Sequence, residues 1–165
     1  MVIAALLVAL IAYALISGGD DDASEKDVVG ADAAEIQELA GDQGHPVYWA
    51  GPTGAETFEW TALEDGKVYI RYLTGDAELE DPRPAFLTVA TYPVGNGVAA
   101  VKKADQSPDT RTQRVPGGGT ALINEGGSTS VYLAYPGSEY QIEVFHPLPA
   151  QARKLVTSGK IRPVP

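Results

Sequence analysis

The residues of this chain that could do chemistry are its carboxylates and two histidines. His45 and His146 are the only histidines and cysteine is absent, so a zinc-type site would have to combine these two with carboxylates. Both histidines precede proline, which favours extended backbone. We therefore expect structural or solvent-exposed roles for them, and no bound metal or cofactor. The absence of cysteine also excludes disulfides, thiolate catalysis and a lipid-modified cysteine.

A carboxylate-dependent hydrolase is the catalytic alternative that the sequence leaves open. Such enzymes need two carboxyl groups facing one substrate. The acidic candidates are many: Glu56, Glu59, Asp76, Glu78, Glu80 and Glu143. Abundance makes their pairing uninformative, and no serine-hydrolase, β-lactamase, zinc-protease, P-loop or dinucleotide-binding signature is present. The glycine run at 117–119 lies between two predicted strands and predicts a hairpin turn. Non-catalytic roles are favoured.

Aromatic residues suggest a binding surface instead. In a strand expected over residues 68–73, alternation places Tyr69 and Arg71 on one face and Ile70 on the other. The same alternation acts around Tyr132. Together with residues of the first and last predicted strands, they form a predicted platform for a partner protein or glycan: Tyr48, Tyr69, Arg71, Tyr132 and Phe145. The alternative is that a helix at 31–40 or the acidic loop at 75–84 covers this face.

Periodicity predicts the elements that position these residues. Apolar residues at helical spacing predict helices over 31–40, 94–104 and 148–158. Aromatic and β-branched runs between Gly- and Pro-containing turns predict strands at 46–50, 56–63, 67–74, 86–93, 110–116, 120–125, 128–136 and 139–147. Short connections favour antiparallel pairing. The prediction is an α+β fold, a twisted antiparallel sheet with helices on one face.

The second half of the chain repeats the order of the first. Val68-Tyr69 recurs as Val131-Tyr132, and each half ends in a predicted helix. One interpretation is a diverged duplication of a ββββα unit over 46–105 and 111–159. The other is a single α+β domain whose aromatic strands resemble one another by chance.

The N-terminal residues predict a membrane segment. Residues 2–16 carry no charge, and Asp20, Asp21 and Asp22 follow with no basic residue before Lys26. We expect a transmembrane signal-anchor at 1–19 that contacts the lipid bilayer through residues 2–17. An acidic flexible tether at 20–30 and an extracytoplasmic domain at 31–165 would follow. The alternative is a signal peptide cleaved after Ala14, which would release a secreted domain.

The net charge of the chain excludes one class of partner. At −10, the summed field repels phosphate backbones, and the basic residues occur only as isolated pairs. We therefore expect no nucleic acid partner.

Four short stretches carry a resemblance: His45–Gly51, Asp81–Pro84, Thr91–Pro93 and Ser130–Gly137. They resemble segments of a group of small, uncharacterised proteins with an N-terminal hydrophobic anchor from high-GC Gram-positive bacteria. The resemblance implies a cell-envelope protein and transfers no activity. The sequence thus favours a membrane-anchored interaction module with an unidentified envelope protein or glycan partner. The alternatives are a secreted or anchored hydrolase and an assembly protein that dimerises through a sheet edge.

Overall fold

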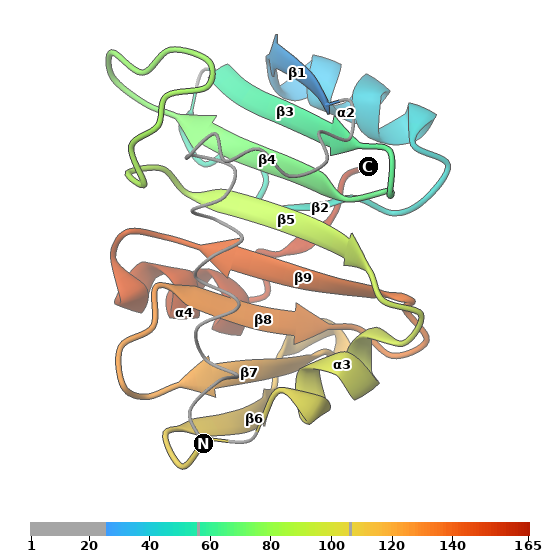
Figure 1. Cartoon of the computed structure of the whole chain (residues 1–165), viewed down its shortest axis with the longest axis vertical. Coiled ribbons are helices and arrows are strands. Elements are labelled where there is room, and N and C mark those ends of the chain that lie inside the picture. The colour runs from blue at the N-terminus through green and yellow to red at the C-terminus, as the bar shows by residue number, and fades with distance from the viewer. Residues whose placement is uncertain (1–25, 56, 106) are drawn as a thin grey trace.

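The computed structural model describes residues 26–55, 57–105 and 107–165. These residues form a large twisted antiparallel sheet of eight strands together with three α-helices, so the α+β prediction is confirmed (Figure 1). None of the helices within these ranges is long and apolar enough to cross a membrane. The predicted signal-anchor lies outside the described residues, as do residues 20–25 of the predicted tether.

The strands of the main sheet follow the order β1-β3-β4-β5-β9-β8-β7-β6. Their bounds are β1 Lys26–Ala31, β3 Thr57–Leu63, β4 Val68–Leu73, β5 Thr88–Pro93, β6 Thr110–Arg114, β7 Thr120–Asn124, β8 Ser130–Ala134 and β9 Tyr140–Phe145. Two short strands, β2 (Tyr48–Trp49) and β10 (Arg162–Pro163), pair only with each other.

Strand β1 corrects the boundary of the predicted tether. Residues 26–30 were expected to be flexible, but they pair with β3 in continuous register from Lys26↔Leu63 to Ala31↔Phe58. The segment KDVVGA is too short and mixed to give a strand signal of its own. Its pairing depends on β3, a partner about thirty residues further along the chain.

The strand order is the same when read inward from either edge. The halves β1-β3-β4-β5 and β6-β7-β8-β9 meet where β5 pairs with β9, from Thr88↔Phe145 to Pro93↔Tyr140. The segment 46–50, expected as the first strand of the first repeat, is β2 and lies outside the main sheet. Strand β1 occupies that edge position instead.

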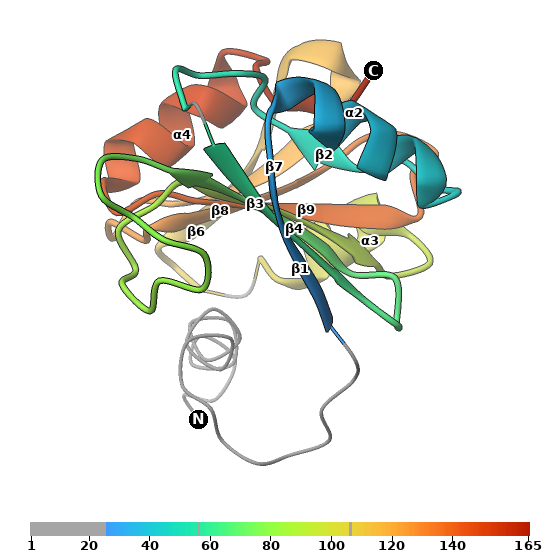
Figure 2. The ribbon, with the colours of Figure 1, turned by 90° about the horizontal axis from the view of Figure 1, so that it is seen from above.

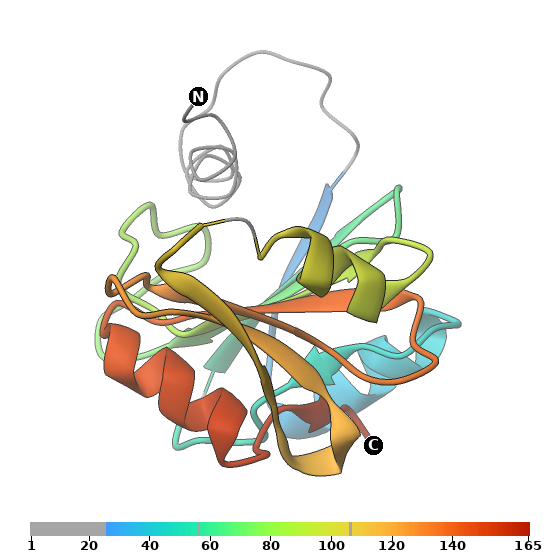
Figure 3. The same ribbon diagram turned by 90° about the horizontal axis from the view of Figure 1, so that it is seen from below.

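The three helices do not share one face of the sheet. Figures 2 and 3 show α2 (Ala33–Asp42) and α4 (Pro149–Thr157) on one side and α3 (Gly97–Lys103) on the other. The prediction of helices on a single face is therefore wrong for α3. Its Val101 packs on the opposite face, against Leu122 and Ala134. Helical periodicity gives the buried side of a helix but not the sheet face that receives it.

Local signals explain where the helices begin. Asp32 caps α2, with its carboxylate accepting from the Glu35 N–H while the Glu35 side chain accepts from the Asp32 N–H. The Asn96 side chain accepts from the Ala99 N–H at the start of α3. Gly97 permits close packing of that helix, because a Cβ there would lie 2.0 Å from the Tyr140 carbonyl oxygen.

The hydrophobic core lies between the sheet and the layer formed by α2, α4 and the β2–β10 pair. We call the sheet surface turned toward this layer the core face. Ile36 of α2 and Val156 of α4 are buried there. The six inner strands of the sheet contribute most of the other core residues: Phe58, Trp60, Val68, Ile70, Tyr72, Val89, Ala121, Ile123, Val131, Leu133, Ile142 and Val144. This face is devoted to apolar packing.

Candidate functional site

The other surface of the sheet, which we call the polar face, holds the chemically versatile residues. Alternation along each strand turns the neighbours of the core residues to this side. Cross-strand register then places Glu59 beside Arg71 and Tyr132 beside Glu143. Thr61, Thr88, Tyr69, Tyr92 and Ser130 share the face. A polar and aromatic surface thus lies back to back with the core.

Four of the five predicted platform residues lie on the polar face: Tyr69, Arg71, Tyr132 and Phe145. Tyr48 does not join them. It belongs to β2 on the core side, where it is buried and its ring stacks on Tyr135 at a centroid distance of 5.6 Å. The predicted platform assumed that the segment 46–50 belongs to the main sheet, and this assumption is incorrect.

A buried carboxylate sits at the seam between the two halves of the sheet. Glu143 of β9 is only 5% exposed. Its Oε1 accepts hydrogen bonds from the Ser130 hydroxyl at 2.6 Å and the Tyr132 hydroxyl at 3.0 Å. Its Oε2 accepts one from the Tyr92 hydroxyl at 2.7 Å. We call Tyr92, Ser130, Tyr132 and Glu143 the seam cluster.

The seam cluster changes the acidity of its tyrosines. Burial raises the pKa of Tyr92 and Tyr132 far above the ordinary value, and the neighbouring charge of Glu143 raises both further. Burial likewise raises the pKa of Tyr69, whose ring meets Tyr92 edge-on at 5.8 Å, to about 12. These hydroxyls are therefore protonated at neutral pH, and those of Tyr92 and Tyr132 donate to Glu143.

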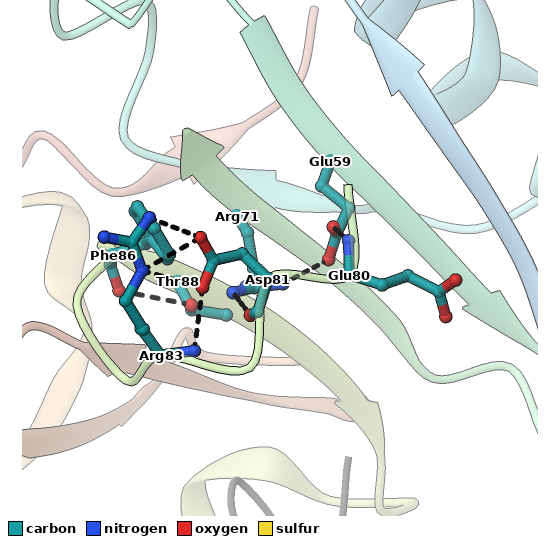
Figure 4. A network of polar contacts seen from close by, with 7 residues as sticks. All are labelled: Glu59, Arg71, Glu80, Asp81, Arg83, Phe86 and Thr88. Carbon is teal, nitrogen blue, oxygen red and sulfur yellow. Dashed lines mark hydrogen bonds and ion pairs between the residues drawn. The ribbon is translucent and has the colours of Figure 1, made fainter. Parts of the chain in front are cut away.

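A second buried carboxylate, Glu59, lies on the same face and has a cationic partner. Glu59 is 3% exposed, and its Oε1 accepts from Arg71 Nη1 at 2.6 Å. Figure 4 shows how this pair holds the acidic loop, residues 74–87. Arg71 Nη2 donates to the Asp81 carbonyl at 2.6 Å, and the Glu80 N–H donates to Glu59 Oε2. The Arg71 guanidinium also lies 5.2 Å from the centre of the Phe86 ring.

Within the acidic loop, Arg83 and Asp81 form a further fork. Arg83 Nε donates to Asp81 Oδ1 at 2.9 Å and Nη2 to Oδ2 at 2.5 Å, which lowers the Asp81 pKa to about 2. The contact is mostly solvent-exposed on the Arg83 side. These contacts give the loop a defined path over Glu59 and Arg71, and they explain a structural role for several acidic residues that the sequence left unassigned.

The two buried carboxylates do not form a hydrolase pair. Glu59 lies on β3 and Glu143 on β9, three strand intervals away, so their backbones are separated by about 14 Å at the usual strand spacing. Paired glycosidase carboxyl groups lie roughly 5–10 Å apart. Glu56 lies outside the described residues.

The histidines are not brought to either carboxylate. The His45 ring stacks on Tyr140 at 5.0 Å, and His146 Nδ1 accepts the Leu148 N–H at 2.9 Å. Burial lowers the pKa of His146. Among the described residues, no group of three or more His, Asp or Glu side chains is placed to hold a metal ion. Gly117 and Gly118 adopt positive φ in the turn between β6 and β7, as the glycine run predicts.

Tyr92 and Ser130 are the residues of the seam cluster that sequence reasoning missed. Tyr92 follows Ala90 by two residues in β5, so alternation along β5 alone places both on the polar face. The contact of Tyr92 with Glu143 could not be found in this way, because 51 residues separate the two.

A groove elsewhere on the molecule does not include the seam cluster. It runs between α3 and the turn after β8, and it is lined by Asn96, Val98, Ala99, Lys102, Arg114, Thr120, Pro136 and Gly137.

No protein-family model matches this chain, and no curated protein or solved structure shows a significant match to it.

Proposed function

We propose that the chain is a non-catalytic interaction module, anchored in the cell membrane by residues 1–19, whose domain lies outside the cytoplasm. The uncharged N-terminal run and the acidic residues after it support the anchor and its orientation. The resemblance to anchored envelope proteins supports the same location. The partner would be an envelope protein or glycan.

The contrast between the two faces of the sheet carries the proposal that the polar face is the binding surface. The core face buries apolar side chains, which is the most stabilising use of a sheet surface. The seam cluster instead buries a carboxylate, although well-packed apolar residues of similar volume are often as stabilising or more so. A feature that folding does not require points to binding. Tyr92, Tyr132 and Phe145 are half-buried and surround this carboxylate with aromatic contact area.

One observation favours the alternative, an anchored or secreted hydrolase. Glu143 is a buried carboxylate with hydroxyl groups around it, which is the type of group that serves as a general acid or base. The separation from Glu59 rules out that one pair, so Glu143 would have to act with a different second group. A binding role for Glu143 requires no second catalytic group.

We also propose that the two halves of the sheet descend from one duplicated unit. The mirrored strand order supports it, as does the equivalent placement of Tyr69 and Tyr132 in the third strand from each edge. The helices do not follow the repeat, since α3 and α4 lie on opposite faces. Duplication of the strands with later divergence of the connections accounts for both observations.

Site-specific cross-linking tests the binding surface, because the chain has no native cysteine. Gln141→Cys places a thiol on the polar face, opposite Tyr92 in the neighbouring strand, and Gln151→Cys places one on the exposed surface of α4. Each variant is labelled with a photoreactive maleimide in isolated membranes and irradiated. We expect discrete adducts from Gln141→Cys that Gln151→Cys does not give. Identical adduct patterns, or none from a fully labelled Gln141→Cys, would contradict the proposal.

A further inference from the structure

The two buried carboxylates of the polar face differ in how their charge is compensated. Glu59 has the Arg71 guanidinium at 2.6 Å. Glu143 has three neutral hydroxyl donors, and no described Lys or Arg forms an ion pair with it. Buried charges in proteins are usually paired or coordinate a metal. Arg71 lies on the same face, but its guanidinium already donates to Glu59 and to the Asp81 carbonyl in the acidic loop.

The hydrogen bonds of Glu143 leave one acceptor direction open. A carboxylate offers about four lone-pair sites, two on each oxygen. Oε1 accepts from Ser130 and Tyr132, whereas among the described donors Oε2 accepts only from Tyr92. The open direction is therefore on Oε2. A donor placed there would complete the carboxylate, and a positively charged donor would also neutralise it.

The surroundings of Oε2 suit a cation that carries organic groups. Tyr69 and Tyr92 meet edge-on beside Glu143, and aromatic rings attract cations through the negative charge of their faces. Tyr92, Tyr132 and Gln141 are half-buried, so solvent reaches the rim of the cluster. The net charge of −10 raises the local concentration of cations and lowers that of anions near the domain.

We propose that the seam cluster binds an ammonium or guanidinium group, with Glu143 Oε2 as the charged acceptor and the tyrosine rings as the walls. This inference rests on the proposed function of the polar face and names the chemistry of its ligand. The group could belong to a small amine or to a Lys or Arg side chain of a partner protein, because both present the same donor to Oε2.

Calorimetric titration of the purified full-length chain in detergent tests the inference. The probes are methylammonium and Nα-acetyl-arginine amide. Glu143→Gln keeps the shape and removes the charge, and Glu125→Gln is the matched control that removes one exposed charge elsewhere. We expect saturable binding by the native chain and by Glu125→Gln. For Glu143→Gln we expect the affinity to fall by a factor of about ten or more. Equal affinity in both variants would overturn the inference, as would no saturable binding below roughly 10 mM.

A second variant keeps the test decisive if Glu143→Gln does not fold. Tyr92→Phe retains the ring and frees both acceptor directions of Oε2, so it should bind the probes at least as tightly as the native chain. A clear loss of affinity in folded Tyr92→Phe would overturn the inference. Tighter binding of the arginine amide would indicate a partner side chain, and tighter binding of methylammonium a small amine; either supports the shared chemistry.

The two proposals fail separately. If the probes do not bind but Gln141→Cys still gives specific adducts, the interaction surface stands and the cation chemistry is wrong. If the probes bind but the cross-linking is not specific to the polar face, the cation site stands and the proposed envelope interaction does not.

Discussion

At the scale of residues, the polar face shows what alternation alone can predict. Tyr69, Arg71, Tyr132 and Phe145 fall on one face because the two-residue period of a strand is a local property. The hydrogen bonds of Glu143 were not predictable, since Tyr92 lies 51 residues away and meets it only where β5 pairs with β9. The prediction for Tyr48 was wrong because its strand, β2, pairs with β10 outside the main sheet.

The buried tyrosines predict a loss of stability at alkaline pH. An unfolded tyrosine ionises near pH 10, whereas burial raises the folded pKa of Tyr69 to about 12 and raises that of Tyr92 and Tyr132 as well. The contribution to stability is therefore complete below about pH 10, and it is lost as the pH rises toward the folded values. Urea unfolding should give a free energy that falls as the pH rises from about 10 toward about 12.

A matched variant isolates the source of this effect. Tyr69→Phe removes one of the titrating hydroxyls and should make the decline over the same pH interval shallower. A free energy of unfolding that stays constant or rises across the interval would contradict the burial of these hydroxyls.

At the scale of elements, the sequence predicted which helices and strands exist better than it predicted what each one packs against. The eight predicted strands and three predicted helices are all present, because the hydrophobic period of a strand or helix can be recognised within one continuous segment. Strand β1 was missed, since only β3 makes its short segment a strand. The face on which α3 packs was missed, because helical periodicity does not identify the sheet face that receives a helix.

The acidic loop offers a prediction at this scale, because Glu59 and Arg71 attach it to β3 and β4. Arg71→Met would leave Glu59 buried without its cation, and removal of one partner from a buried pair typically costs about 3–5 kcal/mol. Urea denaturation should show this loss in the free energy of unfolding. The double variant Glu59→Gln/Arg71→Met should recover much of it, because no charge is left unpaired. A loss below about 1 kcal/mol in Arg71→Met would mean that the pair acts as an exposed one.

At the scale of the whole molecule, one sheet separates two tasks. Its core face supplies the apolar burial that folds the domain, and its polar face carries charged and aromatic groups between α3 and the acidic loop. The general class was predictable from the order of predicted strands and helices. The mirrored sheet order was anticipated only in part, since the first half begins at β1 and contains α2 and β2 as an insertion.

The proposed envelope interaction requires that residues 1–19 hold the domain outside the cytoplasm. Its direct test is to label Gln151→Cys, on the exposed surface of α4, with a membrane-impermeant maleimide in intact cells and then to separate membranes from soluble protein. We predict labelling of a full-length product that stays with the membranes. Labelling that requires cell lysis would contradict the account by placing the domain in the cytoplasm, and a labelled, shortened product in the soluble fraction would replace the anchor with a cleaved signal peptide.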